Sequence, residues 1–289
     1  MELVNHLNSF NTVFFNLDPI TLSRWSTNRT SPSNYKQLLT SLFFKDEIHE
    51  SILNNTSLSD SPIETDKILD IYFKYRNNAG YDKPFIRNEN IEYSIMQHNK
   101  NKRRNVFSYF YNNFNFYLDA YDFVDKNNLK ITSHFFQEYD HKHDRITSHI
   151  QASFLNYDNS VYLNDFLSKK INKKLNSCLD REAIWIDISF FRSKKTFEQL
   201  LYMFVNKIFE LNYTDNPMYV ICTGSYFINI LDSLGGVDIG SIKDSYNNIF
   251  VYEFNSLKFL SNKYIINLYR KYYEQYQIDI NVELKQYIK

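Results

Sequence analysis

Hydrophobic residues recur at helical spacing through the first quarter of the chain. The apolar side chains of segment 1–15 fall on one side of a helix, and the same three-to-four-residue spacing returns in segments 35–44 and 63–76. A polar, serine- and asparagine-rich stretch at 54–62 separates the last two of these segments. The N-terminal region is therefore predicted to be entirely helical, with a break near residue 55.

A further short helix is predicted to begin after Asp18. Aspartate is a good N-cap and the proline that follows it suits the first helical turn. Leu22 and Trp25 lie three apart and would share one buried face. Asn28 tolerates the left-handed conformation that ends many helices, and Pro32 prevents continuation.

The second half of the chain alternates strand-like and helical patterns. Polar and apolar residues alternate in 131–139 and 146–155, which predicts a β-hairpin around the polar turn 140–145. The helical pattern is clearest in 196–211, where seven apolar residues line one face. The remaining expected elements are strands at 106–116, 183–190, 218–223 and 249–254, a strand or helix start at 161–166, and helices at 117–127, 224–234 and 257–277.

Composition adds few constraints. Aromatic residues make up 18% of the 289 residues, so the protein has ample material for a core, and only 5 Gly and 5 Pro occur, so turns must use Asn, Asp and Ser. The formal net charge is zero, so a basic surface for nucleic acid must be local. Cys178 and Cys222 give no disulfide framework. Without a signal peptide or a long apolar run, we expect a cytoplasmic protein with no membrane contact.

A metal site is considered at the hairpin turn and not favoured. His141 and His143 lie between Asp140 and Asp144, but two histidines on a turn rarely suffice and no third ligand follows at a known spacing. We therefore expect a polar turn, no metal and no cofactor.

The segment 18–33 resembles the recognition-helix region of Cro/repressor-type (XRE-like) helix-turn-helix proteins, through its T-L-S-R-W run and the R-T-S-P-S that follows. In that family, the early residues of the recognition helix reach base edges in the major groove. The resemblance implies base contacts by some residues and phosphate contacts by others. The candidate DNA-binding residues are Ile20, Thr21, Ser23, Arg24, Thr27, Arg29 and Lys36.

The strongest basic run follows in 97–105. Its cations are candidate phosphate contacts if the run lies beside a DNA-reading helix, and a solvated loop is the alternative. These cations are Lys100, Lys102, Arg103 and Arg104.

The second half resembles the acyl-CoA N-acyltransferase (GNAT) family in the order of its elements. In that family a strand enters a helix through R/Q-x-x-G-x-G/A, whose amides hold the coenzyme A diphosphate. Arg192 matches the leading residue, but Lys195 and Phe197 stand where small residues are required. The Leu234–Gly235 pair matches the end of a later helix of the family. We therefore expect no conventional binding of acetyl-CoA and assign no catalytic residue, although Tyr226 lies where a general acid would be needed.

Together these patterns predict an α+β protein. Residues 1–55 would form an all-α helix-turn-helix domain, 56–104 a helical and basic linker, and 105–289 a GNAT-like α/β domain with a mixed, mostly antiparallel sheet. The expected function is a sequence-specific regulator that binds double-stranded DNA as a homodimer. Its second domain would be non-catalytic and would mediate dimerisation or sense a small-molecule or protein effector. The alternative is an N-acyltransferase that uses an acyl-CoA donor and has a structural N-terminal domain.

Overall fold

The computed structural model describes residues 2–54, 63–78, 89–97, 113–140, 145–171, 181–223, 227–244 and 247–287. The chain forms two compact units. The first comprises Met1–Ile63 together with Leu257–Lys289, and the second comprises Glu64–Ser256. The first unit is thus built from both ends of the chain, whereas the sequence predicts contiguous segments; the functional division at residues 55 and 104 stays a prediction.

The first unit is helical. Its elements are α1 (Glu2–Phe10), the 3-10 helix η1 (Thr12–Phe14), α2 (Pro19–Ser26), α3 (Asn34–Phe44), α4 (Ile48–Asn54) and α13 (Lys263–Tyr287), and α12 (Ser256–Leu260) spans the boundary with the second unit.

The predicted helix boundaries in this unit are confirmed where caps define them. Asp18 accepts the Thr21 N–H at 2.8 Å and starts α2, as expected of an N-cap. Asn28, just beyond the helix, has the left-handed φ of 55° that the sequence predicts. Local hydrogen bonds therefore fix both ends of α2.

The core of the first unit lies away from α2. Leu7, Phe14, Leu38 and Ile52 are each almost fully buried. The C-terminal helix α13 joins this core, because Arg270 donates a 2.8 Å hydrogen bond to the carbonyl of Ile52. Residues more than 200 positions apart therefore pack in one unit.

The second unit contains a seven-stranded sheet in the order β1-β2-β3-β4-β5-β7-β6. Only β4 and β5 pair in parallel, and every other neighbouring pair is antiparallel. The predicted α+β class with a mixed, mostly antiparallel sheet is confirmed. The strands are β1 (Glu89–Gln97), β2 (Thr132–Asp140), β3 (Arg145–Leu155), β4 (Ala183–Phe190), β5 (Pro217–Thr223), β6 (Val237–Asp244) and β7 (Asn247–Asn255).

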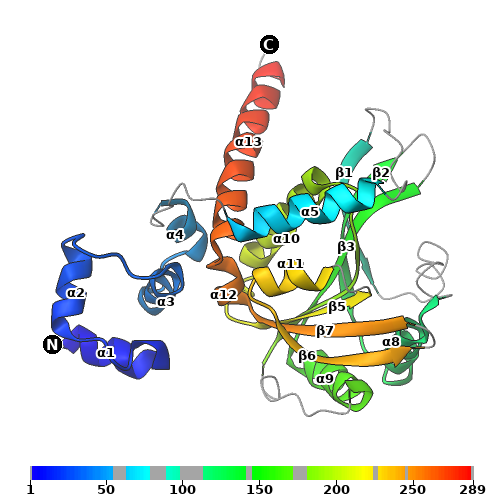
Figure 1. The fold of residues 1–289 in the computed structure, drawn as a ribbon, viewed down its shortest axis with the longest axis horizontal. Coiled ribbons are helices and arrows are strands. Elements are labelled where there is room, and N and C mark those ends of the chain that lie inside the picture. The colour runs from blue at the N-terminus through cyan, green and yellow to red at the C-terminus, as the bar shows by residue number, and fades with distance from the viewer. Residues whose placement is uncertain are drawn as a thin grey trace. The chain divides into compact units, whose positions relative to one another are not determined.

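Helices cover both faces of this sheet (Figure 1). On one face lie α8 (Asn115–Lys126) and α9 (Tyr157–Ile171), whose apolar residues share a core cluster with Trp185 of β4. On the other face lie α5 (Glu64–Asn78), α10 (Lys194–Glu210) and α11 (Ile228–Ser233). Phe204 of α10 contacts Phe136 of β2 edge to face on that side.

Several strands differ from the sequence expectation. The predicted hairpin at 131–155 is present as β2 and β3, and the strands 183–190 and 218–223 are present as β4 and β5. Strands β1 and β6 were not predicted. The segment expected to be a short strand or helix start at 161–166 lies inside α9, and most of the expected strand 106–116 lies outside the described residues.

Helix α11 ends as the Leu234–Gly235 pair predicts. Gly235 adopts a φ of 92°, which favours glycine, and the N–H of Gly236 bonds back to the Leu231 carbonyl at 2.9 Å. A membrane-crossing helix is not found in the part of the chain that the structure describes.

Candidate active site

The sheet of the second unit opens between β4 and β5. These two strands pair only from Ile184 and Met218 to Ile186 and Val220. Strand β4 continues to Phe190 and β5 to Thr223, so their facing edges separate beyond this short ladder. Diverging parallel strands present backbone N–H and C=O groups that an extended, amide-containing chain can bind.

A bulge lies where the two strands part. The register of β3 and β4 shifts so that Gln151 pairs with Ile188 and Ala152 with Ile186, which leaves Asp187 as the extra residue. A bulge breaks the strict alternation of a strand and redirects the side chain at that point. Asp187 thus directly follows Ile186, the last residue of β4 that pairs with β5.

The Asp187 carboxylate is held from two other elements. The hydroxyl of Tyr121 in α8 donates to Oδ2 of Asp187 at 2.8 Å. The amide of Gln151 in β3 donates to the same oxygen at 2.8 Å and to the Tyr121 oxygen at 2.8 Å. All three residues are buried, so the network forms in a low-dielectric setting where hydrogen bonds are strong.

This network borders a small pocket under α8 and α9. The pocket wall is mostly apolar and has only three polar side chains, an arrangement typical of sites that hold an apolar group and fix one polar end. Its lining residues are Ala120, Tyr121, Val124, Ile131, Ser153, Leu163, Trp185 and Asp187.

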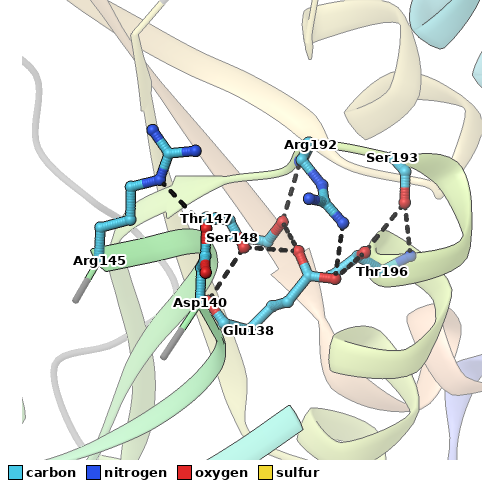
Figure 2. Close-up of polar contacts among 8 residues, drawn as sticks. All are labelled: Glu138, Asp140, Arg145, Thr147, Ser148, Arg192, Ser193 and Thr196. Atoms are coloured by element: carbon cyan, nitrogen blue, oxygen red, sulfur yellow. Dashed lines mark hydrogen bonds and ion pairs between the residues drawn. The ribbon is translucent and has the colours of Figure 1, made fainter. Parts of the chain in front are cut away.

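A second polar cluster lies at the start of α10 on the other face of the sheet (Figure 2). At its centre is Glu138 of β2, which is 5% exposed. Its Oε1 accepts from Thr196 Oγ1 at 2.9 Å and from Arg192 Nη2 at 3.3 Å. Its Oε2 accepts from the hydroxyls of Thr147 at 2.7 Å and Ser148 at 3.1 Å.

The first turn of α10 is also capped from within the chain. Ser193 Oγ accepts the Thr196 N–H at 3.1 Å, and the N–H of Arg192 bonds to Ser148 Oγ at 3.0 Å. Phe197 is 2% exposed and packs in the helix–sheet core, as the sequence predicts, while Lys195 is exposed. The coenzyme A that the resemblance implies does not fit here, because the buried Glu138 carboxylate engages the side chains of Arg192 and Thr196 and places a negative charge beside the turn where a diphosphate would lie.

Cys222 is no candidate nucleophile. It is 7% exposed at the end of β5, and burial raises the pKa of its thiol to about 12, so it stays protonated at neutral pH. His141 and His143 lie outside the described residues, as do Tyr226 and Cys178. Within the described ranges no group of three or more metal-ligating side chains occurs.

The residues predicted to contact DNA gather on and around α2 in the first unit. Thr21 is tied to the helix cap, because its hydroxyl donates to Asp18 Oδ2 at 2.8 Å. The ammonium of Lys36 lies 5.7 Å from the centre of the Trp25 ring. Ile20, Ser23, Arg24, Thr27 and Arg29 are exposed, and Thr21 and Lys36 are half-buried.

The expected packing of α2 is wrong. None of its residues is buried, and Leu22 and Trp25 are only half-buried. The physical reason is that a helix of eight residues with two apolar positions on one face offers too narrow a stripe to be covered. The basic residues Lys100, Lys102, Arg103 and Arg104 lie outside the described residues.

No protein-family model matches the chain, and neither does any curated protein. Among solved structures, a mutant form of the spermidine/spermine N-acetyltransferase of Vibrio cholerae matches 58% of this chain and 96% of its own, with 10% identity and a TM-score of 0.33. The ribosomal-protein-S5-alanine acetyltransferase of Vibrio fischeri matches 61% of this chain and 97% of its own (12% identity, TM-score 0.31). The spermidine N-acetyltransferase of Vibrio cholerae in complex with CoA and spermine matches 58% of this chain and 98% of its own (14% identity, TM-score 0.31).

These findings correct the predicted function. The predicted regulator that binds double-stranded DNA is wrong, since the solved structures that match the chain are described as acetyltransferases. The XRE-like helix-turn-helix resemblance also finds no support.

Of the residues that form the two clusters, Arg192 was singled out from the sequence, whereas Glu138, Asp187, Tyr121 and Gln151 were missed. Asp187 carried a usable signal, since it is the one charged residue in the apolar strand AIWIDISF, and a buried aspartate needs partners. Tyr121 and Gln151 carried no such signal in the sequence, because only the pairing of β3 with β4 and the packing of α8 bring them to Asp187. Glu138 could not be distinguished from the other polar residues that alternate with apolar ones along its strand.

Proposed function

We propose that the second unit is an N-acyltransferase that moves an acyl group from a thioester to an amine. The observation that carries the proposal is the position of Asp187: it is the bulged residue of β4, it lies where β4 and β5 part, and it lines a pocket. A carboxylate fixed at the mouth of an opening between parallel strands is suited to accept a proton there.

Asp187 and Tyr121 would divide the proton transfers between them. Asp187 takes a proton from the acceptor amine, whose nitrogen attacks the thioester carbonyl. The carbon–sulfur bond then breaks and the departing thiolate takes the Tyr121 proton. The 2.8 Å hydrogen bond between the two residues lets the proton on Asp187 return to Tyr121, so both residues end the cycle as they began.

Gln151 would act as a positioning residue. It donates to both Asp187 and Tyr121, and a side chain that touches both members of a pair fixes their separation. The apolar walls of the pocket, including Trp185 and Leu163, would exclude water from the reacting groups.

The test is an acyl-transfer assay on the full chain. Acyl thioesters of N-acetylcysteamine and of coenzyme A are offered with aliphatic polyamines and with peptides that carry a free N-terminus, and the released thiol and the amide product are measured. We expect turnover with at least one pair, and we expect Asp187→Asn and Tyr121→Phe each to lower kcat by about 100-fold or more.

The matched control is Asp165→Asn. Asp165 is an exposed aspartate on α9 that pairs with Lys169 at 2.6 Å, so its substitution should leave turnover unchanged. A folded Asp187→Asn variant with the rate of the unsubstituted protein, or no amide product from any pair, would overturn the proposal.

A further inference from the structure

The start of α10 is where a donor's phosphate groups would be expected to bind. The helix follows β4 after only three residues and runs for 17 residues from Lys194 to Glu210. The first turn of a helix carries free backbone N–H groups and the positive end of the helix dipole, so it favours an anion.

An anion from the protein already lies there. The Glu138 carboxylate accepts one hydrogen bond from the side chain of Thr196 in the first turn and one from the side chain of Arg192 just before it, and two more from the hydroxyls of Thr147 and Ser148. Two donors on each oxygen fill most of the acceptor positions of a carboxylate. The Glu138 carboxylate is therefore satisfied by hydrogen bonds from the protein itself (Figure 2).

Two of the three cations at this turn, Arg192 and Lys194, are also engaged, and the third, Lys195, is exposed to solvent. Arg192 pairs with Glu138 at 3.3 Å, and Lys194 pairs with Asp66 at 3.1 Å and Asp70 at 2.8 Å. A diphosphate placed at this turn would meet the buried negative charge of Glu138, and like charges in a partly buried setting repel strongly.

Aromatic rings occupy the space beside the same turn. Phe191 lies between β4 and α10, and its ring centre is 4.8 Å from that of Phe197 and 5.8 Å from that of Phe227. Phe191 and Phe197 are each 3% exposed or less. Glycine and alanine, which would let a phosphate approach the backbone most closely, do not occur in the described residues 191–197.

We propose, resting on the function proposed above, that Glu138 is an internal anion that replaces the donor's diphosphate at α10. The donor class is then an acyl thioester recognised through its acyl group and its amide-containing arm, with no phosphate contact at this helix. Glu138 is thus a specificity-determining residue that removes the usual advantage of a nucleotide-bearing donor.

The first test compares two donors on the unsubstituted protein. Acetyl-CoA and S-acetylpantetheine differ only in the phosphorylated nucleotide, and calorimetry measures the binding of each. We expect dissociation constants within about threefold of each other, because no phosphate contact at α10 separates them. Acetyl-CoA binding tighter by about 100-fold or more would overturn the proposal.

The second test does not depend on turnover. Inorganic pyrophosphate is titrated into the unsubstituted protein and into Glu138→Gln, which keeps the size of the side chain and removes its charge. We expect no saturable binding to the unsubstituted protein. In Glu138→Gln, where the repulsion is gone, we expect the apparent affinity for pyrophosphate to rise by about tenfold or more. Glu210→Gln, at the other end of the same helix, is the control and should behave like the unsubstituted protein.

The outcomes separate the two proposals. If Glu138→Gln is folded by circular dichroism and gains no affinity for pyrophosphate, the internal-anion proposal is wrong, whatever the transferase assay shows. If the variant gains affinity while no thioester is turned over, the internal anion stands and the proposed transferase function fails. If Glu138→Gln does not fold, the donor comparison on the unsubstituted protein decides.

Discussion

The hydroxyl of Tyr121 in α8 lies 2.8 Å from Oδ2 of Asp187 at the bulge of β4 and donates a hydrogen bond to it. Sixty-six residues separate the two in sequence, and both are buried. A buried carboxylate that loses a donor is costly, so the pair should be coupled in stability as well as in the proposed chemistry.

We predict that Tyr121→Phe lowers the free energy of unfolding by about 1–3 kcal/mol, because it leaves the Asp187 carboxylate with one donor fewer. Urea denaturation of the single variants and of Tyr121→Phe/Asp187→Asn measures the coupling. The double variant should cost clearly less than the sum of the two singles, since both remove the same hydrogen bond. Strict additivity would show that the hydrogen bond does not form in solution.

His134 should make stability depend on pH. Burial, and then the nearby positive charge of Lys207, lowers the pKa of His134 from 6.5 to about 4, and the Tyr93 hydroxyl lies 2.7 Å from its Nδ1. The unfolded chain therefore binds a proton more readily between these pH values. The stabilisation is fully present above about pH 6.5 and is lost as the pH falls towards 4, by up to about 3 kcal/mol.

Urea midpoints at pH 7 and pH 4.5 check this expectation. His134→Gln should reduce the difference in urea midpoint between the two pH values. His6→Gln, which alters an exposed histidine, should leave that difference unchanged. An equal pH slope in the unsubstituted protein and in His134→Gln would exclude His134 as the source.

Trp25 should contribute less to stability than its size indicates. It is half-buried on α2, so Trp25→Ala should lower the free energy of unfolding by about 1 kcal/mol, well below the 3–5 kcal/mol of a core tryptophan. Leu38→Ala, which removes a fully buried side chain in α3, should cost about 2–5 kcal/mol and serves as the comparison. A larger loss for Trp25→Ala than for Leu38→Ala would show that α2 is packed after all.

The two glycines after α11 should respond to substitution for different reasons. A Cβ at Gly236 would lie 2.5 Å from the Phe254 ring, so Gly236→Ala should cost about 1–3 kcal/mol through overpacking. At Gly235 nothing lies within 4 Å of a Cβ, but the φ of 92° is strained for other residues. Gly235→Asn should therefore be tolerated better than Gly235→Ala, as thermal unfolding would measure; equal melting temperatures would exclude backbone strain there.

Much of the secondary structure follows from local sequence signals. Asp18 caps α2 and Gly235 ends α11 because the required hydrogen bonds and dihedral angles involve residues within one turn. The apolar stripe of α10 predicts which face meets the sheet, since a period of 3.6 residues defines a face without any partner. The buried strands β4 and β5 are apparent for a similar reason, because apolar, β-branched runs of that length suit a covered sheet.

The sites, in contrast, depend on the tertiary structure. The bulge that turns Asp187 towards Tyr121 arises from the register of β3 and β4, and register depends on pairing between distant segments. Glu138 reaches Thr196 only because β2 and α10 meet across 58 residues. The packing of α13 with the N-terminal helices is decided in the same way. The sequence alone thus determined where helices and buried strands form, since those depend on neighbouring residues, and the fold decided which polar groups meet, since long-range packing places them.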